Sequence, residues 1–161
     1  MGNARFCVQC GKELVMREHE GRQYPSCADA ACGFIFWDNP LPVVAALIEH
    51  EGAVVLARNA AWPEKVFGLI TGFLEKGEGP DDAVVREVRE ELGLHAQIQG
   101  LIGVYPFREK NQVIIAYHLT AGGAITMSPE IVEVRHVPAH RLKPWSFGTG
   151  FAVRDWLERR G

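Results

Sequence analysis

Three glutamates near the middle of the chain have the spacing of a single helical face. Glu87, Glu90 and Glu91 stand at positions i, i+3 and i+4, so on an α-helix their carboxylates are neighbours. Their mutual repulsion costs an isolated helix about 0.2–0.5 kcal/mol per pair, and a divalent cation would reverse that cost. Mg²⁺ takes carboxylate oxygens and shares its remaining sites with water and substrate phosphates. The spacing therefore indicates a Mg²⁺–phosphate site, and the alternative is a solvated charged face on which Arg86 pairs with Glu90.

The segment that must carry these glutamates has the pattern of an amphipathic helix. From Pro80 to Leu92 the apolar residues recur with a period of about 3.6, and Val85, Val88 and Leu92 fall on the side opposite the glutamates. Pro80 suits the first helical position, and Gly93 supplies a stop. We therefore expect a helix that packs with one face and presents its carboxylates on the other.

The sequence around this helix resembles the signature of the Nudix hydrolase family, G-x5-E-x7-R-E-U-x-E-E-x-G-U, in which U is aliphatic. A chance match to every specified position is on the order of one in ten million for a chain of this length. The matching residues are Gly72, Glu78, Arg86, Glu87, Val88, Glu90, Glu91, Gly93 and Leu94.

The resemblance implies a Nudix α/β/α sandwich with a mixed sheet, which belongs to the α/β class. It also implies that Glu87, Glu90 and Glu91 bind Mg²⁺ or Mn²⁺, and that Gly72 offers its backbone carbonyl to the same metal cluster. The implied reaction is hydrolysis of a pyrophosphate bond in a nucleoside diphosphate linked to another group. The alternative function is that of a catalytically silent Nudix-fold protein that senses nucleotides or binds nucleic acid.

Supporting roles also follow from the resemblance. Arg86 and Glu78 are expected to support the loop and to orient the metal-binding glutamates. Members of the family use as general base either a glutamate of the signature or an acidic residue of a later loop. Here we favour Glu87, which is also a ligand, and Glu130 is the outside candidate, with Glu133 as a further acid in the same segment.

All four cysteines of the chain lie in its first 32 residues, at positions 7, 10, 27 and 32. The spacing C-x2-C-x16-C-x4-C is similar to that of a zinc ribbon, in which Cys7, Cys10, Cys27 and Cys32 bind one structural Zn²⁺. His19 is a weaker alternative ligand. Two disulfides are the other alternative, but the chain shows no signal peptide, and disulfides are rare in reducing compartments.

The turn-rich stretch from Trp37 to Pro42 separates the cysteines from a strongly apolar body. We place a zinc ribbon over residues 1–38 and a Nudix domain over residues 39–161. A last helix is expected over 151–160. Strands are expected over residues 43–48, 53–57, 66–71, 98–104, 113–120 and 132–137, the first two joined as a hairpin by His50-Glu51-Gly52.

A zinc ribbon ahead of a Nudix domain resembles two groups, the NADH pyrophosphatases and a shorter group of FAD and ADP-ribose pyrophosphatases. The shorter group is the more similar, because it shares patterns that match Asn39-Pro40, Asn111-Gln112 and Pro144-Trp145. The substrates implied are ADP-ribose, FAD or an NADH-like dinucleotide. The resemblance also suggests a homodimer.

An adenine or flavin ring needs an aromatic platform, and phosphates attract arginine. For each aromatic candidate ordinary core packing is the alternative, and exposed arginines commonly have no specific role. The candidates for substrate binding are Phe67, Phe73, Tyr105, Trp145, Arg58 and Arg108.

The composition bounds the partners and the compartment. The net charge is −3 over 161 residues, so dense basic surface for nucleic-acid backbone is absent and a small-molecule nucleotide is the expected partner. The chain has no apolar run of the roughly 18 residues that a membrane span needs. We therefore expect a cytoplasmic protein with no membrane contact.

Overall fold

The structure is a computed structural model that describes residues 4–160. The chain divides into two compact units, with the boundary in the sequence between Asn39 and Pro40, and each unit is described by itself. The first three residues of the predicted cysteine module and the final Gly161 lie outside the described residues.

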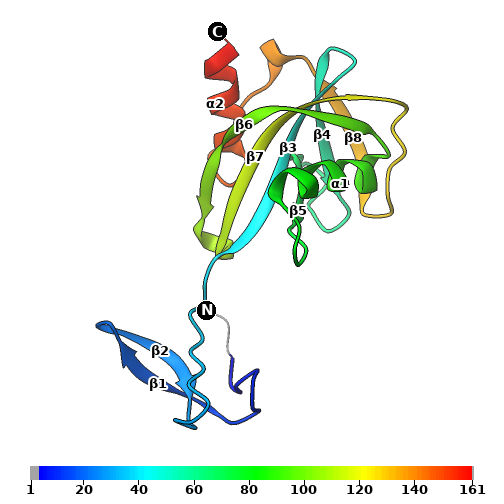
Figure 1. Ribbon diagram of the computed structural model, residues 1–161. Coiled ribbons are helices and arrows are strands. Elements are labelled where there is room, and N and C mark those ends of the chain that lie inside the picture. The colour runs from blue at the N-terminus through cyan, green and yellow to red at the C-terminus, as the bar shows by residue number, and fades with distance from the viewer. Residues whose placement is uncertain (1–3, 161) are drawn as a thin grey trace. The chain divides into compact units, whose positions relative to one another are not determined.

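The first unit is built on an antiparallel hairpin of β1 (Leu14–His19) and β2 (Arg22–Cys27) (Figure 1). Its two-residue loop, Glu20 and Gly21, has φ angles of 52° and 77°, which the tight hairpin turns require. Tyr24 and Trp37 meet edge to face, with their ring centroids 4.9 Å apart. Among residues 4–39 the buried side chains are those of Cys7, Ser26 and Cys27, so the described part of this unit packs mainly around its cysteines.

The second unit contains a six-stranded mixed sheet with the order β6-β7-β3-β4-β8, and β5 pairs with β3 on the outside of this path. Strands β3 and β7 run parallel, and the other paired strands are antiparallel. The strands are β3 (Leu41–His50), β4 (Ala53–Asn59), β5 (Ile70–Phe73), β6 (His95–Phe107), β7 (Gln112–Gly122) and β8 (Ile131–Val137).

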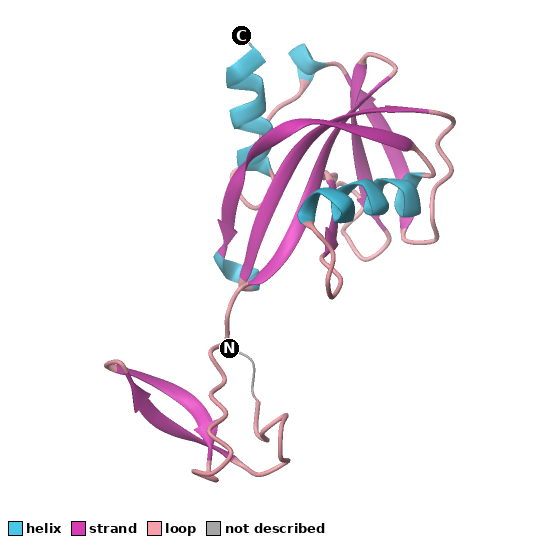
Figure 2. Cartoon of the chain, viewed as in Figure 1, coloured by secondary structure: helices cyan, strands magenta, loops and turns pink. Residues whose placement is uncertain are grey.

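Helices cover both faces of this sheet (Figure 2). Alternate residues of β3 point to opposite faces, so Val44 and Ile48 pack with α1 (Pro80–Leu92), whereas Leu47 packs with α2 (Gly150–Arg160). Two short 3-10 helices, η1 (Arg108–Lys110) and η2 (Ala139–Arg141), complete the unit. The predicted α/β/α sandwich with a mixed sheet is confirmed. Within residues 4–160, no helix is both long and apolar enough to cross a membrane.

One predicted strand is displaced. A strand was expected over residues 66–71, but β5 covers Ile70–Phe73. Val66 instead donates its backbone N–H to the carbonyl of Pro63 in a turn, at 2.9 Å. The chain joins the sheet gradually, because Gly68 forms an isolated bridge to Ala57 before β5 begins. The apolar run therefore begins before the strand does, because residues 66–69 precede β5.

Candidate functional site

Helix α1 begins and ends where its terminal residues predict. Pro80 occupies the first turn after Gly79, and Gly93 adopts the left-handed conformation with φ 67° and donates its N–H to Arg89 O. Ala83, Val84, Val88 and Leu92 are buried against the sheet. The opposite side of α1 therefore carries Glu87, Glu90 and Glu91 away from the core.

Arg86 holds the carboxylates of this helix in fixed positions. Its Nε and Nη2 donate to the two oxygens of Glu78, at 2.7 and 2.9 Å, in a bidentate pair. Its Nη1 donates to Glu87 Oε1 at 2.8 Å and to Glu90 Oε2 at 3.0 Å, and Nη2 also reaches the carbonyl of Phe73 at 3.1 Å. The Arg86–Glu90 pair expected of a solvated face is present, but it is one part of a network that ties α1 to the loop before it.

The glycine that opens the signature makes room for a glutamate. Gly72 lies in β5 opposite Val44 of β3, and a Cβ atom added to it would overlap the side-chain carboxyl of Glu87. The Glu87 carboxylate therefore lies directly against the backbone of β5. A larger residue at position 72 would have to displace it.

The carboxylates differ strongly in proton affinity. The hydrogen bonds from Arg86 lower the pKa of Glu78 to about 2. Burial raises the pKa of Glu87, although Arg86 opposes the shift. Burial, together with the charges of Glu87, Glu130 and Glu90, raises the pKa of Glu91 to about 7. A cation bound beside Glu91 would stabilise its carboxylate and so oppose this rise in pKa.

The glutamate face borders a cleft of about 460 Å³, a size suited to a small-molecule ligand. Of the described residues that line it, Arg86 is the one cationic side chain. The lining residues are Val43, Asn59, Thr71, Gly72, Phe73, Leu74, Glu75, Arg86, Glu87, Glu90, Glu91, Gln112 and Glu130.

The segment after β7 brings Glu130 to this cleft. Thr126 donates its backbone N–H to Leu92 O at 2.8 Å, and Ser128 donates its N–H to Glu91 O at 2.9 Å. These bonds satisfy carbonyls at the C-terminal end of α1 and fix the segment that leads to Glu130. Glu130 is thereby placed on the same cleft as the helix glutamates.

Glu133 has different surroundings. Its carboxylate accepts hydrogen bonds from Arg135 at 2.8 and 2.9 Å and forms an ion pair with Arg58 at 3.5 Å. It is not among the residues that line the cleft. Of the two late acids considered from the sequence, the structure brings Glu130 to the glutamate face.

Phe73 is the one predicted substrate-binding residue that lines the cleft, with 54% of its surface exposed. Phe67 instead lies under the guanidinium of Arg135, at 3.8 Å from the ring centroid. Tyr105 is buried in the core on the α2 face and donates its hydroxyl to Asp155 at 2.7 Å.

The remaining substrate-binding candidates also lie away from the cleft lining. Trp145 packs against the core on the α2 face, Arg58 is turned to Glu133, and Arg108 belongs to η1. Sequence reasoning missed Asn59, Thr71 and Gln112, polar residues that line the cleft. Gln112 opens β7 and belongs to the Asn-Gln pattern noted in the sequence, whereas the other two had no comparable signal.

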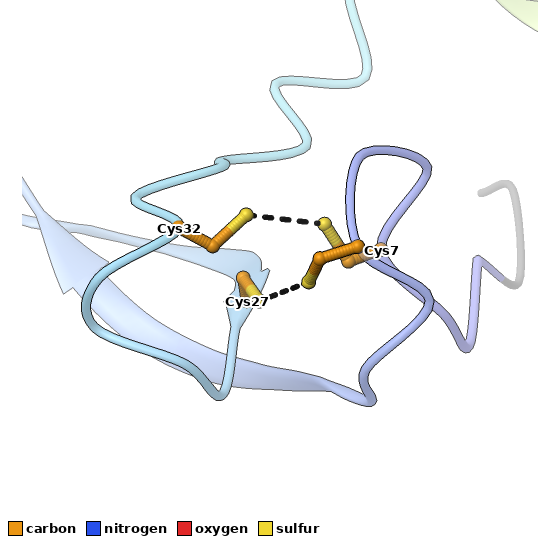
Figure 3. Close-up of side chains that lie close together, drawn as sticks. Cys7, Cys27 and Cys32 are labelled. Atoms are coloured by element: carbon orange, nitrogen blue, oxygen red, sulfur yellow. Dashed lines mark hydrogen bonds between the residues drawn. The ribbon is translucent and has the colours of Figure 1, made fainter.

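The four cysteines converge in the first unit (Figure 3). Cys7 Sγ lies 3.7 Å from Cys32 Sγ, and Cys10 Sγ lies 3.4 Å from Cys27 Sγ. All four are free thiols, so the disulfide alternative does not describe this structure. His19 is not part of the cluster, because its Nε2 is hydrogen-bonded to Ser26 Oγ at 2.8 Å.

The geometry of the cluster suits a tetrahedral metal ion. Sulfurs bound to Zn²⁺ at about 2.3 Å lie roughly 3.8 Å apart, close to the distances found here. Burial acts against ionisation of Cys7, but the backbone amides of Gln9 and Cys10 lower its pKa to about 7. Burial raises the pKa of Cys27 to about 12, so that thiol needs a bound cation to ionise near neutral pH. The longer loop between Cys27 and Cys32 is closed by Asp29, whose carbonyl accepts the N–H of Cys32 at 3.1 Å. The irregular second spacing is therefore accommodated without moving the thiols apart.

Comparisons with known proteins match most of the second unit to one family. The family model described as the NUDIX domain matches residues 38–155. A NAD-capped RNA hydrolase NudC of Pseudomonas putida is 29% identical over 150 residues, which are 92% of this chain and 53% of that protein. Its namesake in Mycobacterium bovis is 42% identical over 79 residues, 48% of this chain and 25% of that protein. The chain thus spans about half the length of the first of these relatives.

Solved structures show the same fold. A NUDIX hydrolase from Nitrosomonas europaea superposes with a TM-score of 0.79 at 26% identity, over 97% of this chain and 92% of that one. An ADP-ribose pyrophosphatase from Streptococcus suis gives a TM-score of 0.63 at 20% identity, over 76% of this chain and 92% of that one. At that identity the second likeness concerns the fold alone.

Proposed function

The chain belongs to the Nudix family, and we propose that it is a Mg²⁺-dependent hydrolase of a nucleoside diphosphate linked to another group. One observation carries the proposal. A cleft of about 460 Å³ is bordered by Glu87, Glu90 and Glu91, while Arg86 fixes the first two from the side. Such a concentration of hard oxygen donors beside space for a ligand fits Mg²⁺ and a polyphosphate.

Glu87, Glu90 and Glu91 would hold the ion, together with the carbonyl of Gly72. When bound, Mg²⁺ neutralises phosphate charge and acidifies the attacking water. Arg86 uses one oxygen each of Glu87 and Glu90, which leaves their second oxygens for the ion. The network thus orients the ligands before substrate arrives.

The reaction adds water across a P–O–P bridge. The water oxygen forms a bond to one phosphorus, the bridging oxygen leaves on the other phosphate with the bonding electrons, and a carboxylate takes the water proton. We assign that proton to Glu130 in place of Glu87, which the sequence favoured, because Glu130 lines the cleft without being part of the Arg86 network. Glu87 is the alternative acceptor.

The substrate is proposed to be ADP-ribose, FAD or an NADH-like dinucleotide. Phe73, exposed at the cleft, offers a face on which a base can stack. The name of the Pseudomonas and Mycobacterium relatives adds an NAD-capped RNA end to the candidates. The net charge of −3 favours the free dinucleotides over a long RNA.

We further propose that Cys7, Cys10, Cys27 and Cys32 bind one Zn²⁺ that stabilises the first unit. Four thiolates complete the tetrahedral coordination of zinc, so this ion would have no open position for chemistry. A reducing compartment such as the cytoplasm is the expected setting, because the thiols must stay free to bind the metal.

A substrate panel with Mg²⁺ tests the proposal. It would compare ADP-ribose, FAD, NADH, diadenosine polyphosphates, dNTPs and NAD-capped RNA, using wild type, Glu90→Gln and a matched control. Asp82→Asn is that control, because Asp82 is an exposed carboxylate on the same helix and outside the cleft. We expect turnover by wild type and the control, and at least a hundredfold loss in Glu90→Gln. Nucleotide binding without turnover would favour the silent nucleotide-sensing alternative.

A further inference from the structure

A second group of metal-ligating side chains lies at the tip of the β3–β4 hairpin. His50 ends β3, Glu51 belongs to the two-residue turn, and His136 lies on β8 opposite Val55 of β4. One ligand atom from each of these three side chains falls within 4.8 Å of the others. The carboxylate cleft is bordered by Asn59, which ends β4. Asn59 lies four residues, or about 13 Å along the strand, from Val55, the partner of His136. The hairpin group is therefore separate from the proposed hydrolytic site.

The surroundings of His50 fix the ring nitrogen that faces the group. Its side chain is buried, with 5% exposed, and its Nε2 lies 2.9 Å from the carbonyl oxygen of Gly123. Because a carbonyl can only accept, Nε2 carries the hydrogen, and in the neutral ring Nδ1 holds a lone pair. A histidine that donates its other N–H to a backbone carbonyl in this way has the orientation typical of a metal ligand.

The lone pair of His50 points at a second imidazole. His50 Nδ1 lies 2.9 Å from His136 Nε2. Two nitrogens that share one tetrahedral Zn²⁺ at about 2.0–2.1 Å are roughly 3.3 Å apart. To exchange the hydrogen bond for a shared metal, the exposed ring of His136 would have to turn and carry its Nε2 sideways by about 2 Å, so that the lone pairs of both rings converge on one ion.

We propose that His50 Nδ1, His136 Nε2 and the carboxylate of Glu51 form a Zn²⁺ site. Two imidazoles and a carboxylate are a common zinc donor set, and water can complete the tetrahedron. On binding, two Zn–N bonds and one Zn–O bond to Glu51 replace water ligands of the aqueous ion, and the hydrogen bond between His50 and His136 breaks. The hydrogen on His136 Nε2 moves through solvent to Nδ1 of the same ring, with no redox change. The ion ties the β3–β4 turn to β8 and, through His50, to the backbone after β7.

Zinc titration of the full chain tests this site. The protein would first be loaded with one equivalent of Zn²⁺ for the thiols and kept in excess Mg²⁺ to occupy the carboxylate cleft. Calorimetry then measures the binding of a further Zn²⁺. We expect wild type to bind it at least about tenfold more tightly than His136→Ala, since even the loss of a supporting contact costs 10–100-fold in metal affinity. Glu51→Gln should show an intermediate affinity.

His140→Ala is the matched control, because His140 is another exposed histidine and lies outside the group. It should bind the further Zn²⁺ as wild type does. NMR of the imidazole nitrogens gives a second readout, in which the His50 and His136 resonances shift together in wild type. Equal affinity in wild type and His136→Ala, or shifts confined to other histidines, would overturn the proposal. Neither result depends on whether the protein hydrolyses nucleotides.

Discussion

Replacing Arg86 by lysine would test whether the geometry of its guanidinium, rather than its charge, organises the proposed metal ligands. Arg86 donates five hydrogen bonds, two to Glu78 and one each to Glu87, Glu90 and the carbonyl of Phe73. A lysine ammonium keeps the positive charge, but it cannot form the bidentate pair and reach the other carboxylates simultaneously. The glutamates would then lose their fixed orientation.

The expected effect is a weaker metal site in a folded protein. Loss of groups that orient metal ligands costs 10–100-fold in affinity, which corresponds to about 1.4–2.7 kcal/mol. The Mg²⁺ concentration that gives half-maximal activity should therefore rise by that factor, and calorimetric Mg²⁺ binding should weaken in parallel. Arg89→Lys is the control, because Arg89 is an exposed arginine on the same helix. An Arg86→Lys variant with the Mg²⁺ dependence of wild type would refute the reasoning.

Three further predictions concern the same two units. Gly72→Ala should reduce activity about a hundredfold or more in steady-state kinetics, because the added Cβ overlaps the Glu87 carboxyl. The control variant Gly100→Ala should keep its activity, because the space around Gly100 is open. In metal-free protein the pKa of Glu91 is about 7 in the folded state, whereas in the unfolded state it has its ordinary value of 4.5. Between these two pH values the folded state binds a proton that the unfolded state does not bind. Stability should therefore rise as the pH falls from about 7 to about 4.5, and chemical denaturation of Glu91→Gln should lack this contribution. Mg²⁺ affinity should fall over the same change, since the ion needs the carboxylate. Cys10→Ser should lower the zinc content by one equivalent relative to wild type, measured by elemental analysis, and leave kcat within about twofold, since the thiols have no part in the proposed chemistry.

The sequence predicted the helix and its charged face well because both depend on local information. Pro80 and Gly93 mark the ends of α1 through their backbone preferences, and the apolar period sets which side is buried. The place of Glu130 could not be predicted in this way. It depends on hydrogen bonds from Thr126 and Ser128 to the end of α1, which join segments that are distant in the sequence.

The aromatic candidates show a second reason for the difference. Phe67, Phe73, Tyr105 and Trp145 are all suited to stacking, and composition cannot say which side of a sheet each will face. Tyr105 and Trp145 belong to the α2 side, and only Phe73 borders the cleft. The predicted strand over residues 66–71 was misplaced for a related reason, because a β-rich run does not reveal the turn that delays its entry into the sheet.

The most direct test of the proposed function is hydrolysis in ¹⁸O-labelled water, with mass spectrometry of the products. Wild type with Mg²⁺ should place one ¹⁸O atom in a single phosphate product of a dinucleotide such as ADP-ribose, and Glu90→Gln should form this product at least about a hundredfold more slowly. Unlabelled products, or a rate that neither Mg²⁺ removal nor Glu90→Gln changes, would contradict water attack at the carboxylate cleft.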